Sequence, residues 1–459
     1  MNIILLSGGS GKRLWPLSND IRSKQFIKIF KKPEHCVPMG TEYTGGYESM
    51  VQRIYRQIRT VDPDATVTIA TSRSQVSAIY NQLGSDVGIS VEPCRRDTFA
   101  AIALAAAYLH DMKHVPAEEA VVVCPVDPYV DEAYFEMLKS MCEAAQKGVE
   151  RLILMGIAPA YPSEKYGYIR PVQKDGKPGF LFTEKPTKEK AEEYIAAGAL
   201  WNGGVFAFKL SYVLEKSEKL LGRDSYNELL AEYADLEKIS FDYAVAEQET
   251  SIAVLRYNGS WRDLGTWNTL TEAMEENTVG DVRLNRNCSN VHVINELGVP
   301  VLVMGGKDLV VAASPEGILV SDKEQSSYIK PFVDSIDQRI MFAEKSWGSY
   351  RVLDVEEDSL TVKVTLNPGH KMNYHSHENR DEVWTVISGY GKAVVDEKEQ
   401  PVKVGDVITM AAGCRHTVIA GDKGLQIIEV QLGREISASD KKKYEWPELP
   451  DLPHEARPT

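Results

Sequence analysis

The sequence has no apolar stretch that approaches the roughly 20 residues needed to span a bilayer. Met1 and Asn2 lead directly into the short apolar run Ile3–Leu6, which leaves no room for the basic segment and long apolar core of a secretory signal. The six cysteines lie far apart and show no CxxC spacing, which is typical of reduced thiols rather than of a disulfide framework. The sequence therefore predicts a cytoplasmic protein without a membrane segment.

An excess of positive charge is also missing. Lys and Arg total 52 against 66 Asp and Glu, so the formal net charge is −14. A surface of this sign repels nucleic acid and anionic membranes, and neither is expected as a partner. A small positive pocket that binds a phosphate is still compatible with this balance.

The 459 residues are enough for two or three domains. In the first half, the strand-like runs Ile3–Leu6, Val67–Ala70 and Val121–Cys124 alternate with the helical stretches Ser49–Arg59 and Phe99–Asp111. Such alternation predicts an α/β fold of the Rossmann-like type, with a parallel sheet covered by helices.

The pattern changes near Gly280, where short β-rich pieces punctuated by glycines replace the long helices. From Gly348 onward, short strands between glycine-containing turns predict an antiparallel sandwich or barrel. The last stretch, Lys441–Thr459, is rich in lysine and proline and is expected to form an extended or disordered tail. We therefore divide the chain into an α/β domain (1–278), a β-rich linker domain (279–338), a β-barrel domain (339–440) and a tail (441–459).

Three glycines directly follow the first predicted strand, in the segment Ser7-Gly8-Gly9-Ser10-Gly11-Lys12-Arg13. Glycine allows backbone N–H groups to curl around a phosphate, because a Cβ would block the approach. The segment is not a Walker P-loop, since Arg13 follows Gly11-Lys12 where Ser or Thr is required, and it is not a dinucleotide fingerprint, since Leu14 replaces the third glycine. For the glycines alone, an ordinary tight turn is the competing interpretation.

The stretch from Gly8 to Ser18, followed by Lys24-Gln25-Phe26, resembles the signature of sugar-nucleotide pyrophosphorylases, and more narrowly that of bacterial mannose-1-phosphate guanylyltransferases. Further blocks match in the same order: Glu92-Pro93 with Arg96-Asp97-Thr98, Pro125-Val126-Asp127, Tyr166-Gly167-Tyr168-Ile169, Glu184-Lys185-Pro186, Trp201-Asn202-Gly203-Gly204, Asp242-Tyr243-Ala244 and Trp261-x-Asp263-x-Gly265-x-Trp267. Lys12, Arg95, Asp97 and Pro128 depart from the usual Thr, Gly, Asn and His. Because of Arg95 and Asp97, ATP or another hexose or heptose 1-phosphate stays open as an alternative substrate, and a sugar-nucleotide sensor without turnover is a third interpretation.

The resemblance implies that mannose 1-phosphate and GTP react to give GDP-mannose and pyrophosphate. The sugar phosphate and the α-phosphate repel each other, so catalysis requires positioning and cations, including Mg²⁺. The implied catalytic residues are Arg13, Lys24, Asp127 and Asp263, of which the two aspartates would hold the Mg²⁺. The implied nucleotide-binding residues are Leu6, Gly8, Gly9, Gly11, Glu92 and Arg96. The implied sugar-phosphate-binding residues are Gly167, Glu184, Lys185 and Asn202.

A second candidate site lies in the predicted β-barrel. Residues two apart on a strand point to the same face, which places His375 and His377 together, and Glu382 and His416 are candidates from neighbouring strands. Three imidazoles and one carboxylate suit Zn²⁺ or another divalent transition metal. The spacing resembles both cupin motifs, and the competing interpretation is a cupin that holds no metal.

In bifunctional guanylyltransferases the cupin domain resembles a type II phosphomannose isomerase, which interconverts fructose 6-phosphate and mannose 6-phosphate. Within the isomerase block, His377, Arg380 and Glu382 keep their places, whereas the usual arginine-containing end is replaced by the stretch 439–446. Isomerase activity therefore stays an open alternative, and a homo-oligomer is compatible with the sequence.

Overall fold

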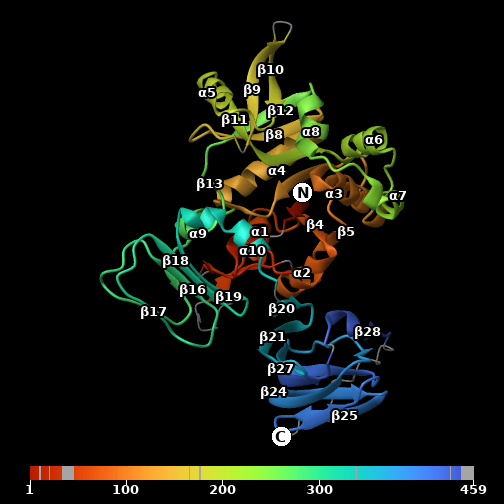
Figure 1. Ribbon diagram of the computed structural model, residues 1–459. Coiled ribbons are helices and arrows are strands. Elements are labelled where there is room, and N and C mark those ends of the chain that lie inside the picture. Colours follow the sequence, from red (N-terminus) through yellow and green to blue (C-terminus); the bar gives the residue numbers. More distant parts are fainter. Residues whose placement is uncertain are drawn as a thin grey trace. The chain divides into compact units, whose positions relative to one another are not determined.

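The computed structural model describes residues 1–9, 12–19, 21–33, 46–164, 166–174, 177–337, 339–434 and 436–445. Two compact units make up the chain, Met1–Gln338 and Arg339–Thr459, and Figure 1 shows both. Gly11 and the segment 446–459 of the predicted tail lie outside the described residues.

A mixed sheet forms the centre of the first unit. Within the described residues it has nine strands: β1 (Asn2–Ser7), β4 (Thr66–Ser72), β5 (Gly88–Glu92), β6 (Ala120–Pro125), β8 (Leu152–Ile157), β9 (Gly167–Lys174), β10 (Lys177–Thr183), β11 (Leu200–Lys209) and β12 (Ile252–Tyr257). Strands β5, β4, β1 and β6 are parallel neighbours, and β11 runs antiparallel to β6, β8 and β9. The prediction of a parallel sheet was therefore right only in part: β8 and β12 are also parallel, whereas β10 and β11 run antiparallel to their neighbours, because an apolar run shows burial but not strand direction.

Helices cover both faces of this sheet. The described α-helices of the first unit are α1 (Met50–Val61), α2 (Val76–Leu83), α3 (Asp97–Ala107), α4 (Glu132–Lys147), α5 (Lys188–Ala196), α6 (Leu210–Leu221), α7 (Tyr226–Ala231), α8 (Phe241–Ala244), α9 (Trp267–Ala273) and α10 (Lys330–Asp334). Alternation along β1 separates two cores: Ile3 and Leu5 pack with α1 and α4, and Ile4 packs with α3 and α6. Among the described helices, none combines the length and the apolarity that a bilayer crossing demands.

Two small ribbons flank the sheet. Strands β2 (Phe30–Lys31) and β3 (Tyr47–Glu48) form one, and β7 (Pro128–Val130) and β13 (Trp261–Asp263) form the other. The β7–β13 ribbon brings residue 263 beside residue 128, although the two are far apart in the sequence. The β9–β10 hairpin projects beyond the rest of the sheet (Figure 1).

The β-rich segment, residues 279–337, contains short strands as predicted. Together with β14 (Thr278–Val279) they are β15 (Val282–Leu284), β16 (His292–Asn295), β17 (Val301–Val303), β18 (Leu309–Ser314) and β19 (Gly317–Asp322). Expected as a separate domain, this segment instead belongs to the first unit and shares its core, since Ile294, Val310 and Ala312 pack in the same cluster as Leu14 and Leu17. Short strands bury too little apolar surface to form a stable core alone.

The second unit is an antiparallel sheet. Its strands are β20 (Phe342–Lys345), β21 (Gly348–Val355), β22 (Ser359–Leu366), β23 (His375–Ser376), β24 (Asp381–Val395), β25 (Lys398–Lys403), β26 (Val407–Met410), β27 (His416–Leu432) and β28 (Lys442–Lys443). The predicted strands Val383–Ile387 and Lys392–Val395 are two halves of β24, which continues through a bulge near Gly389. The beginning of the predicted tail is also part of the sheet, because β28 pairs with β23.

Candidate active site and metal centre

The two aspartates predicted to share a metal lie next to one ammonium group. Asp127 follows β6, and β13 pairs with β7 so that Asp263 lies opposite Pro128. Lys24 Nζ is 2.8 Å from Asp127 Oδ2 and 3.7 Å from Asp263 Oδ1. Three residues from distant parts of the sequence thus meet at the carboxyl edge of the sheet, where open α/β sheets bind their ligands.

The glycine loop follows β1 at the same edge. Gly9 has a φ of +103°, which favours glycine, and a Cβ built on Gly8 or Gly9 would meet no atom within 4 Å. The positions beside Gly8 and Gly9 are therefore free of close side-chain packing. Arg13 lies on the 3₁₀ turn η1 (Lys12–Leu14), and a Cβ built on Gly265 would lie 3.4 Å from Asp263 Oδ2 and 3.7 Å from Arg13 Nη1. The guanidinium and this carboxylate consequently flank the same glycine.

A buried network of amides and hydroxyls lies beneath the loop. Gln75 Nε2 donates to Ser23 Oγ (2.7 Å), which in turn donates to the carbonyl of Gly9 (2.9 Å). Gln25 Nε2 donates to Ser7 Oγ (2.9 Å), and all four side chains are buried. The network holds Ser7 and the carbonyl of Gly9 in place. Gln25 stands inside a matching motif, whereas Gln75 carried no signal in the sequence.

A cleft of about 220 Å³ opens beside the aspartates. Its described lining is rich in acidic, aromatic and small residues, namely Pro125, Asp127, Pro128, Tyr166, Gly167, Glu184, Asn202, Gly203, Gly204, Asp242, Trp261 and Asp263. The ring of Tyr166 lies 5.5 Å from that of Trp261 and 5.0 Å from that of Trp201, so one wall is aromatic. Of the predicted sugar-phosphate residues, Gly167, Glu184 and Asn202 line this cleft.

Lys185 is held beside the cleft by Glu184. Its Nζ lies 2.6 Å from Glu184 Oε1, and this hydrogen bond raises the pKa of the lysine, which therefore stays charged at neutral pH. Lys185 also has a φ of +40°, a strained conformation for a residue with a side chain. The structure thus places a fixed cation, half exposed, next to the carboxylates.

Asp242 was quoted in the sequence only as part of a matching block and was missed as a site residue. It lies on α8, lines the cleft, and its Oδ1 accepts a hydrogen bond from Asn202 Nδ2 (2.7 Å). Loss of hydration, together with the charge of Glu184, raises the pKa of Asp242 to about 7. Asn202 Oδ1 accepts from the backbone of Gly204 (3.3 Å), so Asn202 supports the cleft wall as well as Asp242.

The residues predicted to bind the nucleobase, Glu92 and Arg96, lie at and after the end of another strand, β5. Glu92 ends β5 and accepts a hydrogen bond from the hydroxyl of Tyr233 (2.8 Å), while burial raises the pKa of Glu92. Arg96 Nε donates to the carbonyl of the same tyrosine (3.3 Å). Neither is among the residues that line the cleft. Leu6 lies within β1, and its carbonyl accepts from the backbone of Val126 (3.2 Å).

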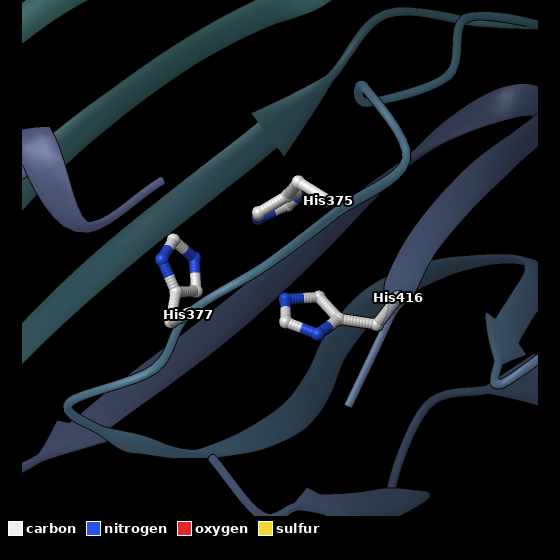
Figure 2. Close-up of side chains that lie close together, drawn as sticks. All are labelled: His375, His377 and His416. Atoms are coloured by element: carbon white, nitrogen blue, oxygen red, sulfur yellow. The ribbon is translucent and has the colours of Figure 1, made fainter. Parts of the chain in front are cut away.

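In the second unit, three histidines converge (Figure 2). The possible ligand atoms of His375, His377 and His416 all lie within 4.8 Å of one another, and all three side chains are buried. Each Nδ1 faces a backbone carbonyl, that of Asn373 (2.6 Å), Asp440 (2.9 Å) or Cys414 (3.0 Å). These contacts favour the tautomer that leaves Nε2 unprotonated, as in metal sites. His416 Nε2 is buried and, among the described residues, makes no hydrogen bond of good geometry, although Glu382 Oε2 lies 3.3 Å away; such a nitrogen fits a metal ligand.

Glu382, the fourth predicted ligand, lies beside two of these histidines. Its Oε1 is 3.2 Å from His377 Nε2, and its Oε2 is 3.3 Å from His416 Nε2. The carboxylate is also paired with Arg380, whose Nε lies 3.0 Å from Oε1 and whose Nη2 lies 2.9 Å from His377 Nε2. Arg380, assigned no role in the site from the sequence, therefore neutralises Glu382 and contacts a candidate ligand.

The α/β unit thus places a glycine-containing turn, two carboxylates and several cations beside one cleft. The nucleotidyl transferase family model matches residues 2–279, and the chain belongs to this family. The model of the mannose-6-phosphate isomerase C-terminal domain matches residues 335–445, and the second unit has this cupin-like fold, as predicted.

Relatives of known name cover nearly the whole chain. Mannose-1-phosphate guanylyltransferase 2 of Escherichia coli is 27% identical over 96% of this chain and 98% of its own length. Alginate biosynthesis protein AlgA of Pseudomonas putida is 28% identical over 96% of this chain and 95% of its own length. The crystal structure of mannose-1-phosphate geranyltransferase from Thermus thermophilus matches with a TM-score of 0.57 and 29% identity, over 72% of this chain and 98% of that one.

Proposed function

We propose that this protein is a mannose-1-phosphate guanylyltransferase, which joins mannose 1-phosphate and GTP to give GDP-mannose and pyrophosphate. The observation that carries the proposal is the convergence of Lys24, Asp127 and Asp263 between the glycine loop and the cleft. Relatives that match over the whole length and are named for this activity support the choice of substrates.

In this mechanism, the side chains hold two mutually repelling anions in line. The backbone of Gly8 and Gly9 cradles the nucleotide phosphates, and Arg13 stabilises the departing pyrophosphate. Lys24 leaves the aspartates when the triphosphate binds and pairs with the phosphates instead. Asp127 and Asp263 offer the oxygen ligands that Mg²⁺ prefers, and the bound ion would neutralise charge at the α-phosphate.

The cleft holds the sugar phosphate in the same proposal. Lys185 pairs with its phosphate, while Glu184 and Asp242 accept hydrogen bonds from its hydroxyls. Glu92 and Arg96, together with Tyr233, form the edge that faces the base. Carboxylate acceptors suit guanine, which presents N–H donors at N1 and N2.

The test is a substrate panel. GTP or ATP is combined with mannose 1-phosphate, glucose 1-phosphate or a heptose 1-phosphate at saturating Mg²⁺, and pyrophosphate release is measured. We expect the fastest release with GTP and mannose 1-phosphate. No release from this pair would refute the proposal, and faster release from another pair would reassign the substrate.

Replacing Asp242 by asparagine is expected to raise the KM for mannose 1-phosphate about tenfold and to change the KM for GTP less than about twofold, because a charged hydrogen-bond acceptor is lost. Only the ionised carboxylate of Asp242 accepts hydrogen bonds at both oxygens, and this ionised form becomes protonated as the pH falls through about 7. The wild-type KM for the sugar phosphate should therefore rise toward acidic pH, and the variant should lose this dependence. Steady-state kinetics across pH check both. The control is the same substitution at the exposed Asp235. If Asp242→Asn kept the wild-type dependence of the mannose 1-phosphate KM on pH, Asp242 would not be the group that binds the sugar.

For the second unit we propose a divalent transition metal, with Zn²⁺ as one candidate, held by His375, His377 and His416. Imidazole nitrogens suit such ions, and Glu382 is the proposed fourth ligand. Binding requires that Arg380 release His377 Nε2. We do not assign sugar-phosphate isomerase activity to this unit, because the arginine-containing end of that motif is replaced here. The full-length relatives described above are named for guanylyl transfer or alginate biosynthesis.

Changing His377 to alanine is expected to abolish metal retention and to lower the melting temperature of the second unit by several degrees. Guanylyl transfer should stay within about twofold of wild type, because the histidine belongs to a separate compact unit. Elemental analysis of the purified protein and a thermal scan make the measurement, with the exposed His370 changed to alanine as the control. Equal metal content in His377→Ala and wild type would remove this site from the proposal.

We place the transfer reaction in the cytoplasm, because the widely spaced cysteines suit a reducing compartment.

A further inference from the structure

The segment that follows the glycine loop is held by the β-rich segment. Both terminal nitrogens of Arg22 contact Glu296, each at 2.8 Å, so the pair is bidentate. Asn19 Nδ2 donates to Glu316 Oε1 (3.0 Å), and Ser314 Oγ donates to the carbonyl of Pro16 (2.6 Å). These side chains belong to one compact unit but come from stretches of the sequence that lie almost 300 residues apart.

The contact is shielded from solvent and closely packed. The side chains of Arg22 and Glu296 are only 10% and 22% exposed. A Cβ built on Gly317 would lie 2.5 Å from Trp15 Cζ2, so the start of β19 lies directly on this indole. A bidentate arginine–carboxylate pair fixes the orientation of both groups, and breaking it at a largely buried position costs more than at the surface.

Three consecutive residues connect this contact to the reaction centre. Arg22 is paired with Glu296, Ser23 donates to the carbonyl of Gly9 (2.9 Å), and Lys24 Nζ lies 2.8 Å from Asp127 Oδ2. A shift of Arg22 along the backbone would therefore move both the glycine loop and the ammonium group. Asn19 reinforces the connection, because its Oδ1 accepts from the backbone of Arg22 (2.6 Å).

We propose that Glu296 is a positioning residue for nucleotidyl transfer: through Arg22 it holds the glycine loop and Lys24 in the geometry that the transition state requires. The β-rich segment is thereby part of the catalytic apparatus, although none of its residues lines the cleft. The inference rests on the proposed function. A displacement of about 1 Å in a charged group can reduce turnover about a hundredfold without loss of binding.

The experiment compares Glu296→Gln, Arg22→Lys and the double variant with wild type in the full chain. We expect kcat to fall about 10- to 100-fold, with the KM for mannose 1-phosphate within about threefold, since the cleft is untouched. If the two residues act only through each other, the double variant should lose no more than the worse single variant. Asp281→Asn is the matched control, because it breaks an exposed ion pair with Arg283 in the same segment (2.9 Å).

A milder variant tests the same contact in case Glu296→Gln or Arg22→Lys fails to fold. Ser314→Ala removes one hydrogen bond to the held segment and should lower kcat severalfold with little change in melting temperature. Normal kcat in a folded Glu296→Gln protein, or a loss seen only in KM for the sugar phosphate, would overturn the positioning role. Additive losses in the double variant would also overturn it. An inactive wild-type protein would instead refute the proposed function, so the two failures are distinguishable.

Discussion

Replacing Asp127 or Asp263 by asparagine is expected to lower kcat by two to four orders of magnitude, roughly 3 to 5 kcal/mol of transition-state stabilisation. Each substitution removes a negative ligand from the place where the two carboxylates face a common cation, Lys24. The amide is nearly isosteric and both side chains are partly exposed, so the fold should be retained.

Pyrophosphate release at increasing Mg²⁺ concentration is the measurement for the aspartates. The Mg²⁺ concentration for half-maximal rate should rise in both variants, while the melting temperature stays within about 2 °C of wild type. Asp86→Asn, at an exposed turn away from the site, serves as the control. If either variant kept more than a tenth of wild-type kcat at ordinary Mg²⁺, that aspartate would not be a metal ligand in the reaction.

Changing Lys24 to methionine is expected to have two opposite effects. Turnover should fall about 10²- to 10³-fold, because a cation that stabilises the phosphates is lost. Without nucleotide, however, divalent metal should bind more tightly, since the ammonium 2.8 Å from Asp127 no longer competes for the carboxylates. Both effects are expected if the lysine occupies the place of the metal until substrate arrives.

Titration with Mn²⁺ followed by electron paramagnetic resonance measures the second effect. The apparent Mn²⁺ dissociation constant of the nucleotide-free protein should fall severalfold in Lys24→Met. The exposed Lys219 on α6, changed to methionine, controls for the loss of one positive charge. Weaker Mn²⁺ binding in Lys24→Met would show that the two aspartates do not form a metal site in the free protein.

The Asp127–Asp263 pair shows how far sequence reasoning reaches. The position of Asp127 after a buried strand and its matching block identified it as a candidate ligand, and Asp263 was identified by its block alone. Their proximity depends on the β7–β13 ribbon, which pairs residues more than 130 positions apart. The role of Asp242 and the support from Gln75 depend in the same way on helices and strands that meet only after folding.

Short sequence patterns were enough to predict features that depend only on neighbouring residues. The glycine loop needs a positive φ at Gly9 and open space above it, the apolar strands need burial, and the spacing of His375 and His377 places both on one face. Tertiary structure alone decided three other features. It made the main sheet mixed, joined the β-rich segment to the core of the first unit, and paired Glu296 with Arg22. Each of these depends on which distant surfaces bury each other, and that choice is set by the packing of the whole chain rather than by any short stretch of it.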